Sequence, residues 1–353
     1  MWQTARCSRL LMLGLPILLI SAACQRKPAP TSVTSGAVTE SDSVVCQTIQ
    51  HEQGETEICG QPQKIVAFGS SVLESLLALG LQPVAYADYL IQPTALYYEQ
   101  PIWQFPYMGH HITSPVVNLG LATSPSIERI AKVQPDLILG TEYNTDQYAT
   151  LSQVAPTLLL KWAEADKNLQ KVAQITNKSE KVEQLFTETD KQIETTRKMF
   201  APVVAAQPNV LLLHSGNLQE IYFGNQVFGL CASLVRDLGF ELVSLPGFNE
   251  FNSNTPAVIS IEALPQLNDA DLVLMFGSNF NQAKELTGTD NFEEYQLSSL
   301  KQAWQENEIA QSLDASLAGQ VYFIPYYLCA GLPGPIGTEL YLNELKQKLL
   351  SAQ

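Results

Sequence analysis

A repeated segment carries two glutamates whose matching positions indicate a shared chemical role. Residues 126–137 begin Ser-Ile-Glu and run into an apolar strand, and residues 260–272 do the same with one extra residue. Each copy places a carboxylate, Glu128 or Glu262, in the first turn of a helix. One such glutamate would only complement the helix dipole. Two at equivalent positions of two similar lobes predict paired docking points for a partner with two-fold symmetry.

Two adjacent serines occupy the position that a nucleophile takes in many hydrolases. Ser70 and Ser71 follow the apolar run 64–68 at the start of a helix. The chain has no Gly-x-Ser-x-Gly elbow, no phosphate-binding glycine loop and no His-Glu-x-x-His helix. Helix capping accounts for the serines more simply, since Ser71 and Glu74 have the spacing of a capping box. We therefore predict that the protein is not an enzyme, with an exported enzyme as the alternative.

Three histidines are candidate metal ligands. His110, His111 and His214 could bind a metal ion together with tyrosines and glutamates. The first two are adjacent, and neighbouring side chains of an extended segment point in opposite directions. No cysteine spacing resembles a zinc site. We therefore expect no metal site and no cofactor.

A long segment rich in aromatic residues, 88–118, interrupts the first lobe. It includes Tyr89 and Trp103 among several tyrosines and prolines. A loop of this length inside a compact lobe is usually functional. It follows the carboxyl end of a predicted strand, where ligands bind in open α/β sheets. Contact with a ligand is therefore predicted, and a loop folded around its own small core is the alternative.

The apolar pattern predicts two α/β lobes separated by helices. Strands at 64–68 and 83–86 flank a helix that ends at Gly80, which is typical of a parallel sheet. A helix at 166–176 precedes another that begins at Ser179 and reaches Val204, about 39 Å long. Further strands are predicted at 136–140, 156–160, 209–213, 241–245, 271–276 and 321–324, with helices at 226–238 and 338–350. The predicted boundaries are 46–165 for the first lobe, 166–206 for the linking helices and 207–353 for the second lobe.

The first 23 residues have the pattern of a signal peptide. Arg6 and Arg9 precede an apolar run, 10–20, that is too short to cross a bilayer. Small residues then precede Cys24, as in a bacterial lipobox, where the cysteine becomes the lipidated first residue. Residues 24–45 are rich in Pro, Ser and Thr and predict a flexible tether. We expect an exported protein on the periplasmic or cell-surface face of a membrane, held there only by a lipid on Cys24; ordinary secretory cleavage is the alternative.

The composition is acidic, with 20 Lys and Arg against 35 Asp and Glu, and loss of the signal leaves 18 basic residues. An acidic exported protein is a poor candidate for binding nucleic acid. Cys46 and Cys59 flank a segment with a glycine at a hairpin tip, which predicts a disulfide across the hairpin. Cys231 and Cys329 either form a second disulfide or remain as buried thiols.

Three stretches, taken in order, resemble the periplasmic substrate-binding proteins of iron–siderophore and cobalamin ABC importers. They are residues 64–84, 126–139 and 169–181, and the resemblance covers roughly residues 46–353. It implies an α/β fold of two Rossmann-like lobes with mostly parallel sheets, joined by one long helix. It also implies a monomer that captures a ferric siderophore between its lobes and delivers it to an ABC permease dimer. In the family, one glutamate per lobe docks on the permease, and the matching residues here are Glu128 and Glu262.

In this family the cargo is contacted by loops at the carboxyl ends of strands. By position those contacts fall on Ser70, Tyr89, Trp103, Tyr143, His214, Tyr222, Phe276, Tyr326 and Tyr327. Relatives often have an arginine before the final Gly-Pro-Ile, where this chain has Pro333. Because arginine is scarce after the signal, a neutral or weakly charged chelate held by stacking and hydroxyl groups is favoured over ferric citrate. Haem, cobalamin or a bare metal ion is the alternative cargo, and a lipid-anchored scaffold or signalling protein is a further alternative.

Overall fold

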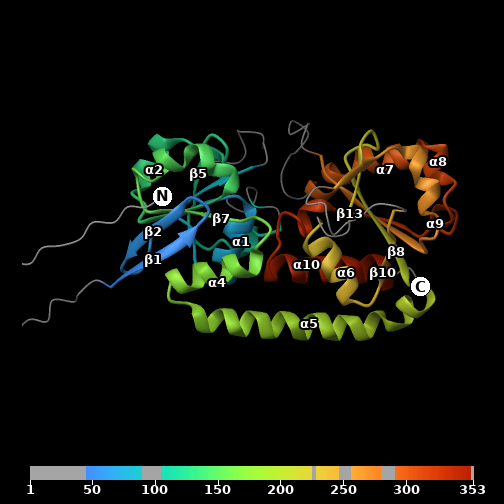
Figure 1. Ribbon diagram of the computed structural model, residues 1–353, viewed down its shortest axis with the longest axis horizontal. Helices are drawn as coiled ribbons and strands as arrows, with labels where there is room; N and C mark the ends of the chain where they lie inside the picture. The colour runs from blue at the N-terminus through green and yellow to red at the C-terminus, as the bar shows by residue number, and fades with distance from the viewer. Residues whose placement is uncertain are drawn as a thin grey trace, which may run out of the picture. The chain divides into compact units, whose positions relative to one another are not determined.

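Two β-sheets, each covered by helices, make up most of the structure, a computed structural model (Figure 1). It describes residues 45–89, 105, 107–224, 228–245, 256–279 and 291–350. Residues from Val44 to Gln353 form one compact unit. Within the described part of the chain, no helix is both long enough and apolar enough to span a membrane.

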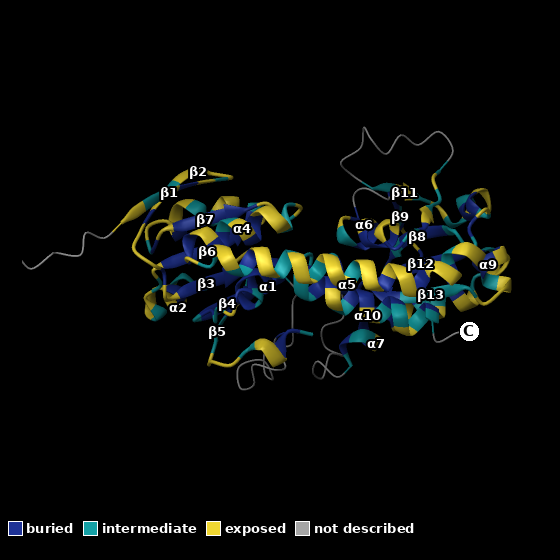
Figure 2. Ribbon diagram, turned by 90° about the horizontal axis from the view of Figure 1, so that it is seen from below, coloured by how far each residue is buried: buried dark blue, intermediate teal, exposed yellow. Residues whose placement is uncertain are grey.

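The first lobe is built on a parallel five-stranded sheet in the order β5-β4-β3-β6-β7. Its strands are β3 (Ile65–Phe68), β4 (Ala85–Asp88), β5 (Val117–Leu121), β6 (Leu137–Thr141) and β7 (Thr157–Leu160). Its helices are α1 (Ser70–Ala78), η2 (Gly109–His111), α2 (Ile127–Val133), η3 (Glu142–Gln147) and α3 (Tyr148–Leu151). Every residue of β3, β4, β6 and β7 is buried, as expected for a parallel sheet covered on both faces (Figure 2).

The second lobe repeats this arrangement in the order β11-β9-β8-β12-β13, with β10 also paired to β8. Its strands are β8 (Asn209–Ser215), β9 (Ile221–Phe223), β10 (Glu241–Leu242), β11 (Ala257–Ile259), β12 (Leu272–Gly277) and β13 (Val321–Pro325). Its helices are α6 (Leu230–Asp237), η5 (Ile261–Leu267), α7 (Phe292–Glu306), α8 (Glu308–Gln311), α9 (Asp314–Leu317), η7 (Tyr326–Leu328) and α10 (Pro335–Leu350). Only β9 runs against its neighbours, so the prediction of mostly parallel sheets is confirmed.

The two sheets correspond in strand order, although β9 is antiparallel and β10 has no counterpart in the first lobe. In each, the first long strand, β3 or β8, lies at the centre. An edge strand, β5 or β11, leads into the Ser-Ile-Glu segment, and the following strand, β6 or β12, returns beside the central one. The repeated sequence therefore marks the same crossover in both lobes.

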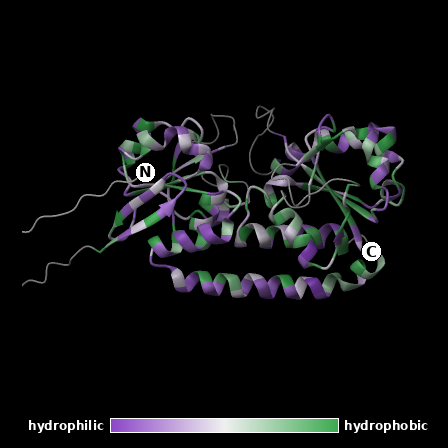
Figure 3. Ribbon diagram, viewed as in Figure 1, coloured by the Kyte–Doolittle hydropathy of each residue, from purple (hydrophilic) through white to green (hydrophobic). Residues whose placement is uncertain are grey.

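One long helix, α5 (Ser179–Ala206), joins the lobes, and α4 (Ala165–Ile175), which precedes it, packs in the core of the first lobe. The 28 residues of α5 begin at the predicted serine and run two residues past the predicted end. The described buried side chains of α5 are Val182, Thr196, Phe200 and Val203. Hydrophilic and hydrophobic residues are interleaved along α5, as expected for an amphipathic helix (Figure 3). Its apolar positions pack against both lobes, since Val182 belongs to the core of the first and Phe200 to the core of the second.

Three local predictions are wrong. The second Ser-Ile-Glu segment forms a 3-10 helix, because Pro265 lies inside it and has no N–H to donate. The strand predicted at 241–245 is limited to Glu241–Leu242. The capping box at Ser71 does not form: α1 begins at Ser70 after Gly69, and the Glu74 side chain bonds to the second lobe instead.

Both candidate disulfides are present. An N-terminal hairpin of β1 (Cys46–His51) and β2 (Gly54–Cys59) places Cys46 directly opposite Cys59, and the two are bonded. Gly54 makes the turn at φ +112°, a conformation that favours glycine. Cys231 and Cys329, whose state the sequence left open, are also bonded.

Candidate ligand-binding site

Three aromatic residues gather at the carboxyl ends of strands in the first lobe. Tyr89 follows β4, Tyr143 lies two residues after β6, and Trp162 lies two residues after β7. Their ring centroids are 5.6–6.2 Å apart in edge-to-face arrangements. We call these three residues the first-lobe trio. Tyr143 is 59% exposed, so the trio presents an aromatic surface to solvent.

Buried polar groups hold the trio in place. The Tyr89 hydroxyl shares a 2.6 Å hydrogen bond with Thr141 Oγ1 and donates another of 2.7 Å to Asn144 Oδ1. Asn144 is itself fixed through Nδ2, which donates to the Ala122 carbonyl at 2.8 Å. Gly69, at φ +88°, leaves room for the Tyr89 ring, which a side chain there would meet. The trio is therefore organised before any ligand arrives.

A second aromatic group lies in the second lobe. The imidazole of His214, near the end of β8, lies between the rings of Tyr222 and Tyr326, with centroid distances of 5.5 and 4.0 Å. His214 Nε2 is 2.7 Å from Ser278 Oγ. We call Tyr222, His214 and Tyr326 the second-lobe stack. Burial lowers the pKa of His214 to about 4, so the imidazole is neutral at physiological pH.

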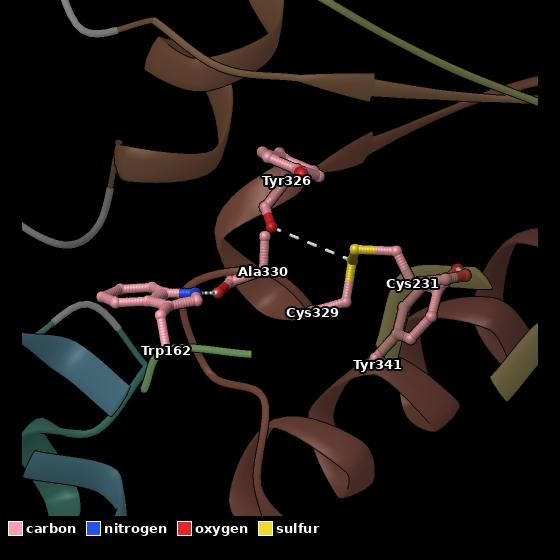
Figure 4. The surroundings of a disulfide bond; sticks show 6 residues. All are labelled: Trp162, Cys231, Tyr326, Cys329, Ala330 and Tyr341. Atoms are coloured by element: carbon pink, nitrogen blue, oxygen red, sulfur yellow. Dashed lines mark hydrogen bonds between the residues drawn. A yellow bond between two sulfur atoms is a disulfide. The ribbon is translucent and has the colours of Figure 1, made fainter. Parts of the chain in front are cut away.

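The trio and the stack lie near each other. Burial raises the pKa of Tyr326 to about 12, and its interaction with Tyr143 of the other lobe adds to the shift. Trp162 Nε1 donates a 3.0 Å hydrogen bond to the carbonyl of Ala330, four residues after Tyr326 (Figure 4). The segment that begins at Tyr326 thus supplies one ring of the second-lobe stack and is hydrogen-bonded to the first-lobe trio.

The Cys231–Cys329 disulfide lies beneath this segment. Cys329 is three residues after Tyr326, and both cysteines are almost fully buried. The disulfide fastens the segment to α6, where the carbonyl of Cys231 also accepts a 3.0 Å hydrogen bond from the Tyr341 hydroxyl (Figure 4). It therefore fixes the backbone that carries Tyr326.

Among the described residues, the charged side chains hydrogen-bonded to the two aromatic groups are carboxylates. Glu142 Oε2 accepts a 2.9 Å hydrogen bond from the backbone N–H of Trp162, and Glu220 Oε2 accepts one of 2.8 Å from the Tyr222 hydroxyl. The arginines of the described residues act elsewhere: Arg129 bonds to the Asn118 carbonyl, and Arg197 and Arg236 interact with Asp237. Lys161, beside Trp162, forms a 3.4 Å ion pair with Glu52.

Three of the predicted contact residues are buried beneath the two aromatic groups. Ser70 is 2% exposed and donates a 2.6 Å hydrogen bond to the Gly331 carbonyl. Phe276 is fully buried against Tyr326, and Tyr327 packs between Tyr107 and Phe292. Each of these side chains points into packed protein, so none is a surface for a ligand.

Two tryptophans complete the comparison with the sequence predictions. Trp103 lies outside the described residues. Trp162 was missed, although it follows β7 at the same edge as Tyr89 and Tyr143, so the rule that ligands bind beyond strand ends would have found it.

The two repeated glutamates are both exposed at the first turn of their helices. Because β5 is parallel to β4, and β11 runs in the direction of β8, each glutamate follows a strand that ends at the carboxyl edge of its sheet. Hydrogen bonds from its own backbone N–H and from Ser260 lower the pKa of Glu262, so its carboxylate is ionised. The lobes thus present equivalent carboxylates on equivalent edges.

Among the described residues, one cluster has the spacing of a metal site: Cys46, Glu57 and Cys59. Its two cysteines form the hairpin disulfide, so their sulfurs are not available as thiolate ligands.

Two α/β lobes joined by a single long helix, with aromatic side chains gathered where strands end, define a two-lobed solute-binding protein. Comparison with known proteins gives the family. The chain belongs to the periplasmic binding protein family, whose model matches residues 65–328.

Similar proteins come from several bacteria. The "Probable siderophore-binding lipoprotein YfiY" of Bacillus subtilis is 27% identical over 78% of this chain and 81% of its own length. The iron(3+)-hydroxamate-binding protein FhuD of the same organism is 24% identical over 70% of this chain and 74% of its own. The crystal structure of Staphylococcus aureus SirA with staphyloferrin B has a TM-score of 0.65, with 22% identity, and covers 86% of this chain and 98% of that one. The expected class, a substrate-binding protein of the periplasmic type, is confirmed.

Proposed function

We propose that the protein is the substrate-binding component of an ABC importer and that its cargo is a ferric siderophore bound between the first-lobe trio and the second-lobe stack. Membership of the periplasmic binding protein family supports the transport role. Relatives described as binding siderophores and iron(3+)-hydroxamate support the class of cargo. The expectation that the protein is not an enzyme agrees with this family.

The observation that carries the cargo proposal is the chemistry of the two aromatic groups. Rings contributed by both lobes offer stacking surfaces, and His214 adds no positive charge because its pKa is lowered. Glu142 and Glu220 add negative charge at the edges. An anionic chelate would be repelled here, whereas a neutral or cationic chelate with flat or apolar ligand arms would be retained.

Fluorescence quenching of the purified protein tests this proposal. The panel contains ferric chelates of neutral, cationic and trianionic charge, with ferric citrate, haem and cobalamin. We expect the neutral or cationic chelates to bind at least tenfold more tightly than the trianionic ones. Preference for a trianionic chelate, or for haem or cobalamin, would contradict the proposed cargo.

A pair of variants assigns the binding to the site. Tyr326→Ala removes the ring that stacks on His214 and should weaken binding by about 1–3 kcal/mol. Tyr148→Ala is the matched control, because this tyrosine packs against His51 of the N-terminal hairpin. Equal effects of the two changes would place the cargo elsewhere.

We further propose that Glu128 and Glu262 dock on the two subunits of the permease. Support comes from their exposure and from their equivalent positions after the edge strands β5 and β11. A partner with two-fold symmetry can meet both carboxylates with the same basic residues. Truncating one member of such a desolvated pair typically costs about 2–5 kcal/mol.

The docking test separates transport from cargo binding. Glu128→Ala and Glu262→Ala should each reduce uptake strongly while leaving the cargo dissociation constant unchanged. Glu188→Ala, on the exposed face of α5, is the control and should transport normally. Full uptake by the double variant would show that these glutamates only complement their helix ends.

A further inference from the structure

A carboxylate whose hydrogen-bond partners in the described part of the chain are backbone amides, not cations, is buried where the two lobes meet. Glu74, on α1 of the first lobe, is 1% exposed. Its Oε2 accepts a 2.8 Å hydrogen bond from the N–H of Gly334, and its Oε1 accepts one of 2.7 Å from the N–H of Gly337. These amides lie at the start of α10 in the second lobe. The first lobe therefore supplies the acidic cap for a helix of the second.

The backbone around these amides is fitted to the carboxylate. A Cβ added at Gly334 would lie 3.0 Å from the Glu74 carboxylate, and one added at Gly337 would overlap the Leu332 carbonyl. Leu332 is fully buried in the core of the first lobe, although it belongs to the second-lobe segment. Only small residues allow the two helices to approach this closely.

The same segment makes the other hydrogen bonds between the lobes described above. Ala330 accepts from Trp162, and Gly331 accepts from Ser70. Tyr326, at its start, is a member of the second-lobe stack. One segment therefore begins at Tyr326, the ring proposed to contact cargo, and ends eleven residues later at Gly337, whose N–H is bonded to Glu74.

The electrostatic surroundings of Glu74 are simple. Burial raises its pKa from 4.5 to about 7, and the amides of Gly337, Gly334 and Ile336 oppose that shift. The polar neighbours on α1 itself are serines. The charged residues of the helices packed against α1 do not contribute to the shift: they are Asp166, Lys167 and Lys171 on α4, and Glu339, Glu344, Lys346 and Lys348 on α10.

We propose that Glu74 is the residue that positions the two lobes, and that protonation of its carboxylate tightens their contact. The ionised form is held by two amides but is deprived of water, whereas separation of α1 from α10 rehydrates it. The neutral acid loses less on burial. The lobes should therefore separate more often as the pH rises, and the distance between the two aromatic groups should vary with them.

The size of the effect follows from proton linkage. A group with a pKa of about 7 when buried and 4.5 when hydrated favours the closed contact about 30-fold more at pH 5.5 than at pH 8.5. The sign is fixed, because the state with the higher pKa is the state that protons stabilise.

Distances between the lobes test the proposal without cargo, so the outcome does not depend on the proposed function. Spin labels are introduced through a non-canonical amino acid at Lys132 on α2 and Gln305 on α7, both exposed. In the full chain, double electron–electron resonance spectroscopy should give one narrow distribution of distances between the two labels at pH 5.5. At pH 8.5 a longer-distance population should appear. A wild-type distribution that does not change between these pH values would overturn the proposal with no substitution needed.

Two variants assign the effect to this carboxylate. Glu74→Gln keeps the shape without the charge, retains one acceptor oxygen for the two amides, and should give the same distribution at both pH values. Glu344→Gln is the matched control, since this glutamate of α10 also has a pKa raised by burial but pairs with Lys348 of its own helix. It should behave as wild type. Broadening at pH 8.5 that survives in Glu74→Gln, or that disappears in Glu344→Gln, would assign the pH response to another group.

The consequence for cargo rests on the proposed function. If cargo binds between the lobes, its dissociation constant should rise severalfold from pH 5.5 to pH 8.5 in wild type and stay level in Glu74→Gln. A pH-dependent lobe distance with a level dissociation constant would retain the role of Glu74 and place the cargo elsewhere.

Discussion

Removal of the Cys231–Cys329 disulfide should destabilise the protein more than removal of the hairpin disulfide. A cross-link stabilises mainly by restricting the unfolded chain, and the effect grows with the length of the loop it closes. The two bonds close loops of 98 and 13 residues. The chain-entropy relation gives about 4.7 kcal/mol for the longer loop and about 2.9 kcal/mol for the shorter. Because the loops do not overlap in sequence, the two effects should be additive.

Urea unfolding of two double variants measures this difference. Cys231→Ala with Cys329→Ala should lower the free energy of unfolding by about 2 kcal/mol more than Cys46→Ala with Cys59→Ala. Alanine is preferred to serine because both cysteines of the longer loop are buried, and a hydroxyl there would need a partner. Equal losses, or a larger loss for the hairpin pair, would refute the argument from loop length.

The two variants also separate stability from the geometry of the site. Cys329 lies three residues from Tyr326, whereas the hairpin disulfide joins β1 to β2, and neither strand carries a member of the two aromatic groups. Measured well below the unfolding transition, cargo affinity should fall about tenfold, or 1.4 kcal/mol, in the first variant and stay unchanged in the second. An unchanged affinity in both would mean that η7 is held in place without the disulfide.

Three further predictions follow from single residues. The pKa of His214 is lowered to about 4, so the unfolded chain takes up a proton at a higher pH than the folded chain does. The free energy of unfolding should therefore fall by up to about 3 kcal/mol from pH 6.5 to pH 4. In a pH series of unfolding midpoints, His214→Gln should flatten this decline. Gly337→Ala should destabilise by about 3 kcal/mol or more, since its Cβ would overlap the Leu332 carbonyl, and a midpoint within a degree of wild type would contradict this. Cys24→Ala should release the protein from the membrane fraction or leave it unprocessed, and retention of the cleaved form would contradict lipid anchoring.

The elements with strong periodic patterns were predictable from the sequence. The long helix α5 begins at the predicted serine because Ser179 opens a continuous amphipathic pattern. The central strands β3, β8 and β12 are short apolar runs bounded by polar or glycine residues, which is typical of buried parallel strands. The repeated Ser-Ile-Glu segment likewise predicts the equivalent crossovers of the two lobes.

Contacts between segments far apart in the chain were not predictable in the same way. Glu74 has the spacing of a local capping box, and a single sequence cannot show that the amides it binds lie about 260 residues away. Ser70 and Tyr327 were placed correctly at strand ends, but packing against the other lobe buries both side chains. Position along a strand therefore identified the right edge of the sheet without distinguishing its exposed side chains from its buried ones.

The contacts between the lobes argue for limited motion on binding. α5 is a single helix packed on both lobes, and Tyr107, Phe292 and Tyr327 form an aromatic contact among themselves in the core of the first lobe. Glu74 and Ser70 add hydrogen bonds to a backbone segment that glycines allow to approach closely. A large hinge rotation would have to break all of these contacts together. Smaller displacements of the lobes would strain fewer of these contacts, and the two hydrogen bonds accepted by Glu74 are the ones whose strength depends on a proton.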